Sequence, residues 1–121
     1  MTDKTFEELR DYTLAWAENK DLLHEGNAEK QFMKFIEEVF EFRDEWILWA
    51  HEYKKWIYGK VDFVEFRGNM KLEMGDIFVT LIILCEQLNL DPVKCLSKTY
   101  EKIKSRKGKT INGTFIKEED L

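Results

Sequence analysis

The segment from Met70 to Leu88 constrains the fold more than any other part of the chain. Drawn as a helix, it carries apolar side chains around nearly its whole circumference, and only Thr80 interrupts the run from Ile77 to Leu84. A helix of this kind is stable in water only when other elements surround it. We therefore predict that this segment is the central helix of an all-α protein.

Three further helices are expected around it. Residues 28–52 repeat apolar side chains at three- and four-residue steps, which predicts one long amphipathic helix. Residues 6–19 follow Thr5, which has a glutamate three positions later and therefore predicts a capping box. Residues 92–105 follow Asp91, a favourable N-cap, and begin with a proline at the first helical position.

The remaining segments are less regular. Residues 53–68 lose the helical pattern and fit either a short helix or a loop that packs its aromatic side chains. Residues 107–121 contain two glycines and alternate weakly, which fits a short hairpin or an extended arm. Together these segments predict one four-helix-bundle-like domain spanning residues 1–121, with an irregular or hairpin tail.

Charge is distributed unevenly along the chain. Residues 94–121 hold eight basic and four acidic side chains, whereas the preceding residues hold 11 basic and 20 acidic ones, and the net charge is −5. An acidic body with a basic tail is a poor surface for duplex nucleic acid. This distribution suits a small polyanion that is held by a metal ion on one side and by Lys and Arg side chains on the other.

The sequence contains no segment that predicts membrane insertion. The first twelve residues have no apolar run resembling a signal peptide. The longest apolar run, from Ile77 to Cys85, is far shorter than the roughly 20 residues of a membrane span. We therefore expect a cytoplasmic protein that has no membrane partner.

Two pairs of carboxylates carry the strongest chemical signal. Glu38 and Glu41 are three residues apart on one predicted helix, as are Glu73 and Asp76 on another, so the members of each pair share a helix face. On the central helix, Glu73, Asp76 and Thr80 fall within a strip of about 60° on an otherwise apolar cylinder. Four carboxylates in one cleft require cations, and oxygen ligands without thiolate or imidazole favour Mg²⁺ or Mn²⁺.

Simpler interpretations remain open for these acidic residues. Glu73 and Asp76 could form buried salt bridges, and a glutamate-rich face on residues 28–52 could simply be solvated. Glu37 could orient a water or a lysine, or face solvent. A di-iron carboxylate site is disfavoured, because neither His24 nor His51 follows a glutamate at the Glu-x-x-His spacing.

The order and spacing of the carboxylates resemble a known family. Glu37–Glu41 has the form Glu-Glu-x-x-Glu, and Glu73–Asp76 has the form Glu-x-x-Asp some tens of residues later. Gln31 and Lys34 lead into the first motif. This pattern resembles the MazG-like, all-α nucleoside triphosphate pyrophosphohydrolase superfamily, and the resemblance covers the chain from roughly Leu9 to the tail.

The resemblance implies Mg²⁺-dependent cleavage of a nucleoside triphosphate into a nucleoside monophosphate and pyrophosphate by a homodimer or dimer of dimers. It also implies that the metal ligands are Glu38, Glu41, Glu73 and Asp76. We expect Glu38 or Glu41 to accept the proton of the attacking water. Candidate substrate contacts are Lys34, Lys102, Lys104, Arg106 and Trp16. A solvated basic face is the alternative for each of the basic residues, and core packing is the alternative for Trp16.

Two alternatives to this function remain. The first is a non-catalytic helical protein that keeps the cleft for a metal or a nucleotide. The second is a dUTPase-like or phosphoribosyl-ATP-pyrophosphatase-like enzyme of the same architecture.

Overall fold

The computed structural model describes residues 3–57 and 63–121, with side chains described for residues 3–51 and 67–121. The chain divides into two compact units, Met1–Leu90 and Asp91–Leu121. The first unit contains the helices α1 (Phe6–Asn19), η1 (Glu25–Asn27), α2 (Ala28–Ile57) and α3 (Phe63–Gln87). The second contains α4 (Pro92–Ile103), β1 (Gly108–Ile111), β2 (Thr114–Lys117) and η2 (Glu118–Asp120). The prediction of a mostly helical protein is confirmed, with a small two-stranded sheet added at the C-terminus.

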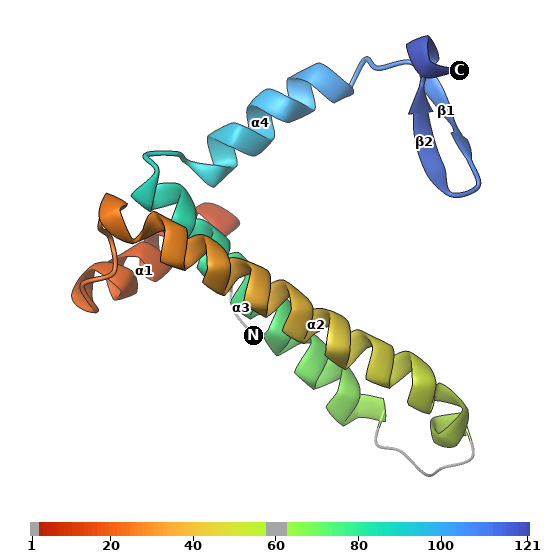
Figure 1. The fold of residues 1–121 in the computed structure, drawn as a ribbon, viewed down its shortest axis with the longest axis horizontal. Helices are drawn as coiled ribbons and strands as arrows, with labels where there is room; N and C mark the ends of the chain where they lie inside the picture. Colours follow the sequence, from red (N-terminus) through yellow and green to blue (C-terminus); the bar gives the residue numbers. More distant parts are fainter. Residues whose placement is uncertain (1–2, 58–62) are drawn as a thin grey trace. The chain divides into compact units, whose positions relative to one another are not determined.

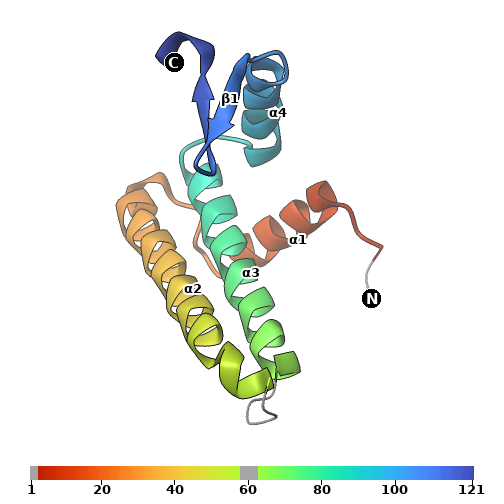
Figure 2. The ribbon, with the colours of Figure 1, turned by 90° about the vertical axis from the view of Figure 1, so that its right-hand side faces the viewer.

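The first unit is built on an antiparallel pair of long helices, α2 and α3 (Figures 1 and 2). A hydrogen bond of 3.2 Å joins the Gln31 side chain of α2 to the carbonyl oxygen of Thr80 in α3. The short helix α1 packs against α3, where the rings of Phe6 and Phe78 meet edge to face with their centroids 5.9 Å apart. Helix α3 therefore contacts both of the other α-helices of the unit, as its apolar sequence predicts.

Local signals explain where these helices begin and end. The predicted capping box is present, because the backbone N–H of Glu8 donates to the Thr5 hydroxyl and the N–H of Thr5 donates to the Glu8 carboxylate. Helix α3 ends where Asn89 adopts a positive φ of 57° and the Leu90 N–H donates to the Cys85 carbonyl, a common C-terminal arrangement. The predicted N-cap of α4 is also present, because Asp91 accepts from the backbone N–H of Val93.

The helix boundaries between residues 50 and 70 differ from the prediction. Helix α2 continues to Ile57 and α3 begins at Phe63, so the helical part extends further on both sides than the apolar pattern indicated. Gly68, which the sequence suggested as a boundary, lies inside α3, and a Cβ at this position would meet nothing within 4 Å. The predicted conformation of residues 58–62 lies outside the described residues.

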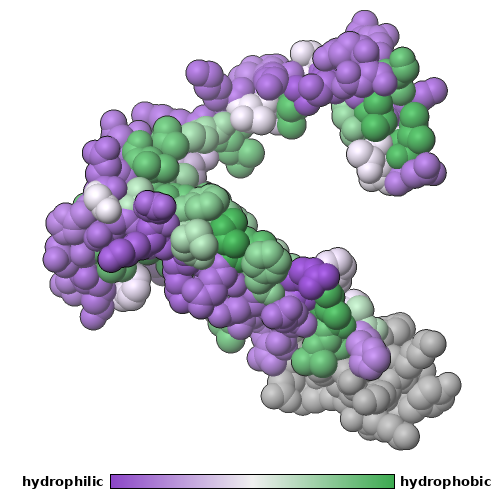
Figure 3. All heavy atoms as spheres, viewed as in Figure 1, coloured by the Kyte–Doolittle hydropathy of each residue, from purple (hydrophilic) through white to green (hydrophobic). Residues whose placement is uncertain are grey.

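The prediction that the central helix is buried holds for only part of α3. Thr80, Ile82 and Ile83 are buried, but Phe78 is 43% exposed and Leu72 is 71% exposed. Among the described side chains, the buried hydrophobic ones are Ala17, Ile82, Ile83 and Cys85. Figure 3 shows a band of hydrophobic atoms along the α2–α3 pair beside a hydrophilic band. A single chain thus leaves much of its apolar surface open.

The second unit consists of α4 followed by a β-hairpin. Strands β1 and β2 pair antiparallel in the register Gly108↔Lys117, and the turn residues Asn112 and Gly113 have φ values of 50° and 80°. Two consecutive positive φ values are typical of the two-residue hairpin turn whose twist matches that of the strands. Of the two alternatives predicted for the tail, a hairpin or an extended arm, the hairpin is the one observed. Within the described parts of the chain, no helix is long and apolar enough to cross a membrane.

Candidate metal centre

The antiparallel register of α2 and α3 determines which acidic residues meet. The Gln31–Thr80 hydrogen bond pairs the first part of α2 with the last part of α3. Glu38 lies two turns further along α2, and Asp76 lies about one turn earlier along α3, so the two motifs fall opposite each other. The sequence predicted both motifs, but only this register brings them together.

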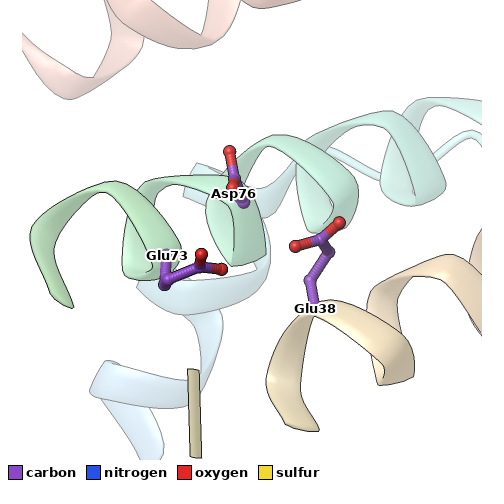
Figure 4. Close-up of side chains that lie close together, drawn as sticks. All are labelled: Glu38, Glu73 and Asp76. Atoms are coloured by element: carbon purple, nitrogen blue, oxygen red, sulfur yellow. The ribbon is translucent and has the colours of Figure 1, made fainter. Parts of the chain in front are cut away.

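Three of the four predicted ligands form one cluster (Figure 4). Glu38 projects from α2 toward α3, where Glu73 and Asp76 lie on successive turns. One carboxylate oxygen from each residue lies within 4.8 Å of the other two. Glu38 is buried at 7% exposure, Glu73 is half-buried and Asp76 is exposed. The cluster therefore has a buried end at Glu38 and an end open to solvent at Asp76.

Two oxygens in this cluster are buried without a hydrogen bond. Among the described residues, neither Glu38 Oε2 nor Glu73 Oε2 has a hydrogen-bond partner. An unsatisfied buried polar atom is costly, and more so when it belongs to a charged group. Both oxygens sit on the facing helices α2 and α3, where one divalent cation could satisfy them together.

The surroundings raise the pKa of two of these carboxylates, Glu73 and Glu41. The pKa of Glu73 is above its ordinary value because burial disfavours the ionised form, and because Asp76, Glu38 and Glu45 add negative charge nearby. The pKa of Glu41 is raised by hydrogen bonding to the Glu38 carboxyl and by the charge of Glu38. The fourth predicted ligand, although exposed, is thus close enough to interact with Glu38. This repulsion is the electrostatic condition that a bound cation would relieve.

Lys34 is the cation nearest to the cluster among the described salt bridges. Its Nζ atom lies 3.3 Å from Glu38 Oε1 and 3.8 Å from Glu37 Oε2. The pKa of Lys34 is raised by the hydrogen bond to Glu38, and further by the charges of Glu37 and Glu38. Glu37 itself is exposed. Glu37 therefore lies near a lysine and also faces solvent, so both of these interpretations fit the geometry.

Trp16, a candidate for stacking on a nucleobase, lies in a groove between α1 and α3. The groove has a volume of about 330 Å³ and is lined by Leu9, Tyr12, Thr13, Trp16 and Val79. Trp16 is 50% exposed, so half of its surface remains open to a ligand. Val79 follows Asp76 by three residues on α3, so the groove begins one helical turn from the carboxylates.

The basic candidates Lys102, Lys104 and Arg106 belong to the second unit. Lys102 lies in the last turn of α4, Lys104 is its C-cap and Arg106 follows it. Lys104 forms an ion pair with Glu101 on the same helix. These three residues therefore form a short basic stretch at one end of α4.

Two residues contribute more to the centre than the sequence indicated. Glu45 is one of the charges that raise the pKa of Glu73, so it borders the cluster. The sequence contains a signal for this position of Glu45, because Glu45 follows Glu38 by seven residues and therefore shares its helix face. Gln31 joins α2 to α3, a role that no pattern in the sequence reveals, because the partner is a backbone carbonyl 49 residues away.

Comparisons with known proteins do not add to this description. No protein-family model matches the chain, and neither curated proteins nor solved structures provide a match. The centre therefore has to be interpreted from its own residues.

Proposed function

We propose that the protein is a Mg²⁺-dependent nucleoside triphosphate pyrophosphohydrolase with a four-helix, MazG-like fold. One observation carries the proposal. Two buried carboxylate oxygens without a hydrogen-bond partner, Glu38 Oε2 and Glu73 Oε2, belong to a cluster of three carboxylates within 4.8 Å. The order Glu-Glu-x-x-Glu followed by Glu-x-x-Asp supplies the second support.

The donor set fits the metal. Glu38, Glu73 and Asp76 offer hard oxygen ligands, and the group contains no thiolate or imidazole, so Mg²⁺ is favoured and Mn²⁺ is a suitable substitute. The exposed position of Asp76 keeps one side of the site open to a phosphate-bound cation. A bound Mg²⁺ supplies neutralisation of the triphosphate charge and activation of a water molecule.

The chain's own residues supply the remaining steps. Glu41 is exposed and lies close enough to interact with Glu38, so it is placed to accept the proton of a water that attacks the α-phosphorus. Glu38, which interacts with Glu41, is the alternative acceptor. In this proposal Trp16 stacks on the base in the groove beside Val79, and basic side chains contact the phosphates. Lys34, which lies beside the cluster in the first unit, is the candidate for those contacts.

Incubation with each NTP and dNTP in the presence of Mg²⁺ tests the proposal directly. The expected products are the nucleoside monophosphate and pyrophosphate in equal amounts, and release should stop when the metal is chelated. Products are best separated by chromatography, because orthophosphate together with a diphosphate would indicate a different bond and contradict the proposal. If dUTP and phosphoribosyl-ATP are added, the same panel also detects a dUTPase-like or phosphoribosyl-ATP-pyrophosphatase-like preference.

A non-catalytic protein that binds a metal or a nucleotide is the second candidate. The direct ion pair between Lys34 and the predicted ligand Glu38 favours it, because the pair holds a ligand partly neutralised without a metal. Nucleotide binding without turnover of any substrate in the panel would support this candidate.

We also propose that the chain functions as a homodimer or a dimer of dimers. On α2, Met33, Phe40 and Ile47 are spaced by seven residues and are 61%, 58% and 41% exposed. Seven residues are nearly two helical turns, so these side chains form one stripe, as in helices that pair with another helix. Few of the described hydrophobic side chains are buried, which also supports an oligomer, because a domain of this length normally buries a larger core.

A further inference from the structure

Lys34 pairs with Glu38, one of the three clustered carboxylates that would also bind a metal ion. Its Nζ atom is 3.3 Å from Glu38 Oε1, while the other oxygen of the same carboxylate, Glu38 Oε2, is buried without a hydrogen-bond partner among the described residues. Glu38 is therefore neutralised from only one side. Lys34 differs from its partner in exposure, because its side chain is 51% exposed and that of Glu38 is 10% exposed.

We propose that Lys34 is a built-in counter-ion that holds the Glu38 carboxylate in the metal-free protein and is displaced from it when a divalent cation binds. This inference rests on the proposed metal site and adds a device that regulates its affinity. The ammonium group of Lys34 and a divalent cation need the same carboxylate, and the cluster of Glu38, Glu73 and Asp76 is better neutralised by two charges than by one.

In this inference, the displaced Lys34 side chain has a second role, as a phosphate contact. Lys34 is attached to α2 one turn before Glu38, and half of its side chain already faces solvent. Its flexible stem lets the ammonium group swing outward, where it can donate to a phosphate oxygen of a metal-bound ligand. The same residue thus weakens binding of the metal alone and strengthens binding of the metal together with a phosphate. A site of this kind favours the metal–phosphate complex over the free cation.

Binding of Mn²⁺ to the full chain, followed by electron paramagnetic resonance, tests the inference. Lys34→Met keeps most of the aliphatic stem and removes the charge, so this variant should bind Mn²⁺ alone about two- to fivefold more tightly, the range expected for a partly exposed ion pair. Its affinity for inorganic pyrophosphate in the presence of saturating Mn²⁺ should fall. Lys34→Arg should restore both wild-type values.

Lys30→Met is the matched control. Lys30 lies one turn further from Glu38 on the same helix, is exposed and forms no salt bridge among those described. If Lys30→Met tightens Mn²⁺ binding as much as Lys34→Met does, the effect arises from long-range electrostatics. The role of Lys34 as a counter-ion in contact with Glu38 is then overturned. Equal Mn²⁺ affinity of the wild type and Lys34→Met would overturn it as well.

The design separates this inference from the proposed function. If the wild type and Lys34→Met both bind Mn²⁺ with the same affinity, the metal site stands and only the role of Lys34 fails. If neither binds Mn²⁺, the metal site itself is wrong and the counter-ion role fails with it. Tighter Mn²⁺ binding with unchanged pyrophosphate affinity would support the counter-ion and overturn the phosphate contact.

Discussion

Gln31 donates a hydrogen bond of 3.2 Å to the backbone carbonyl of Thr80, and this contact belongs to the register in which the two acidic motifs face each other. Thr80 uses its own hydroxyl within α3, where it donates to the carbonyls of Asp76 and Ile77. The Thr80 side chain is therefore occupied inside its helix, while its carbonyl connects the helix to α2. The carboxylates lie about two turns away along the same helix pair.

Replacing Gln31 by Met should test this contact. The change keeps the length of the side chain but removes the donor, so it should lower the free energy of unfolding by about 0.5–1.5 kcal/mol, the typical net contribution of one hydrogen bond. Urea unfolding of the wild type and variant measures this difference. Gln31→Glu is a useful companion, because it keeps the shape and replaces the donor by an acceptor. An unchanged midpoint in both variants would show that this hydrogen bond contributes no net stability.

Neutralising Glu73 should stabilise the metal-free protein while removing its response to metal. Gln at this position relieves repulsion from Asp76 and Glu38 and provides an N–H donor for them, so the chelator-treated variant should gain about 0.5–2 kcal/mol near neutral pH. Added Mg²⁺ should raise the melting temperature of the wild type but not of this variant.

Glu86→Gln, an exposed change on the same helix, is the control for Glu73→Gln and should behave like the wild type in both measurements. A less stable Glu73→Gln protein would mean that the ionised carboxylate makes a favourable contact without metal, contrary to the proposed repulsion.

The stabilising effect of Glu73→Gln on the metal-free protein should change with pH in one direction. The folded-state pKa of Glu73 and that of Glu41 lie above the ordinary value of 4.5, so the folded protein binds more protons than the unfolded chain just above that pH. Their contribution to stability is therefore fully present below about pH 4.5 and is lost as the pH rises through the folded-state pKa values. The stability difference between Glu73→Gln and the metal-free wild type should thus widen as the pH rises above about 4.5, and level off once the pH exceeds the folded-state pKa of Glu73.

Melting temperatures of both proteins across this pH range, in the presence of a chelator, provide the measurement. A difference that narrows with rising pH would indicate that Glu73 is held ionised by a cationic partner.

The molecular mass of the protein in solution tests whether the stripe on α2 is a subunit interface. Phe40→Lys places a charge in the centre of the stripe formed by Met33, Phe40 and Ile47, so it should shift the protein toward the monomer. Light scattering after size-exclusion chromatography measures the mass. Glu18→Lys changes an exposed polar position on α1, away from the stripe on α2, and should leave the assembly intact. If Phe40→Lys and the wild type have the same mass, this stripe is not the interface.

Local signals made much of the fold predictable from the sequence. Thr5 and Asp91 fix helix starts through contacts within three residues, and both caps are present. The end of α2 and the start of α3 were missed because the apolar period fades there, while helix formation continues without it. For the centre, residue spacing predicted that Glu73 and Asp76 share a face, which the cluster confirms. The Lys34–Glu38 pair also fits spacing, because the two residues are four apart on α2. Spacing could not predict that Glu38 is buried, because this depends on how α3 covers α2.

Replacing Asp76 by Asn is the most direct test of the carboxylate site as a catalytic centre. Asp76 is the exposed member of the cluster, so the isosteric amide should leave the fold and the assembly unchanged. Pyrophosphate release should nevertheless fall by about 100-fold or more, because loss of a group that merely supports a metal ligand already costs about 10–100-fold. Asp44→Asn, an exposed carboxylate outside the cluster, should retain full activity. Circular dichroism and Mn²⁺ titration of both variants separate loss of metal from loss of structure. A folded Asp76→Asn protein that retains wild-type turnover would exclude Asp76 as a ligand and, with it, the cluster as the site of the reaction.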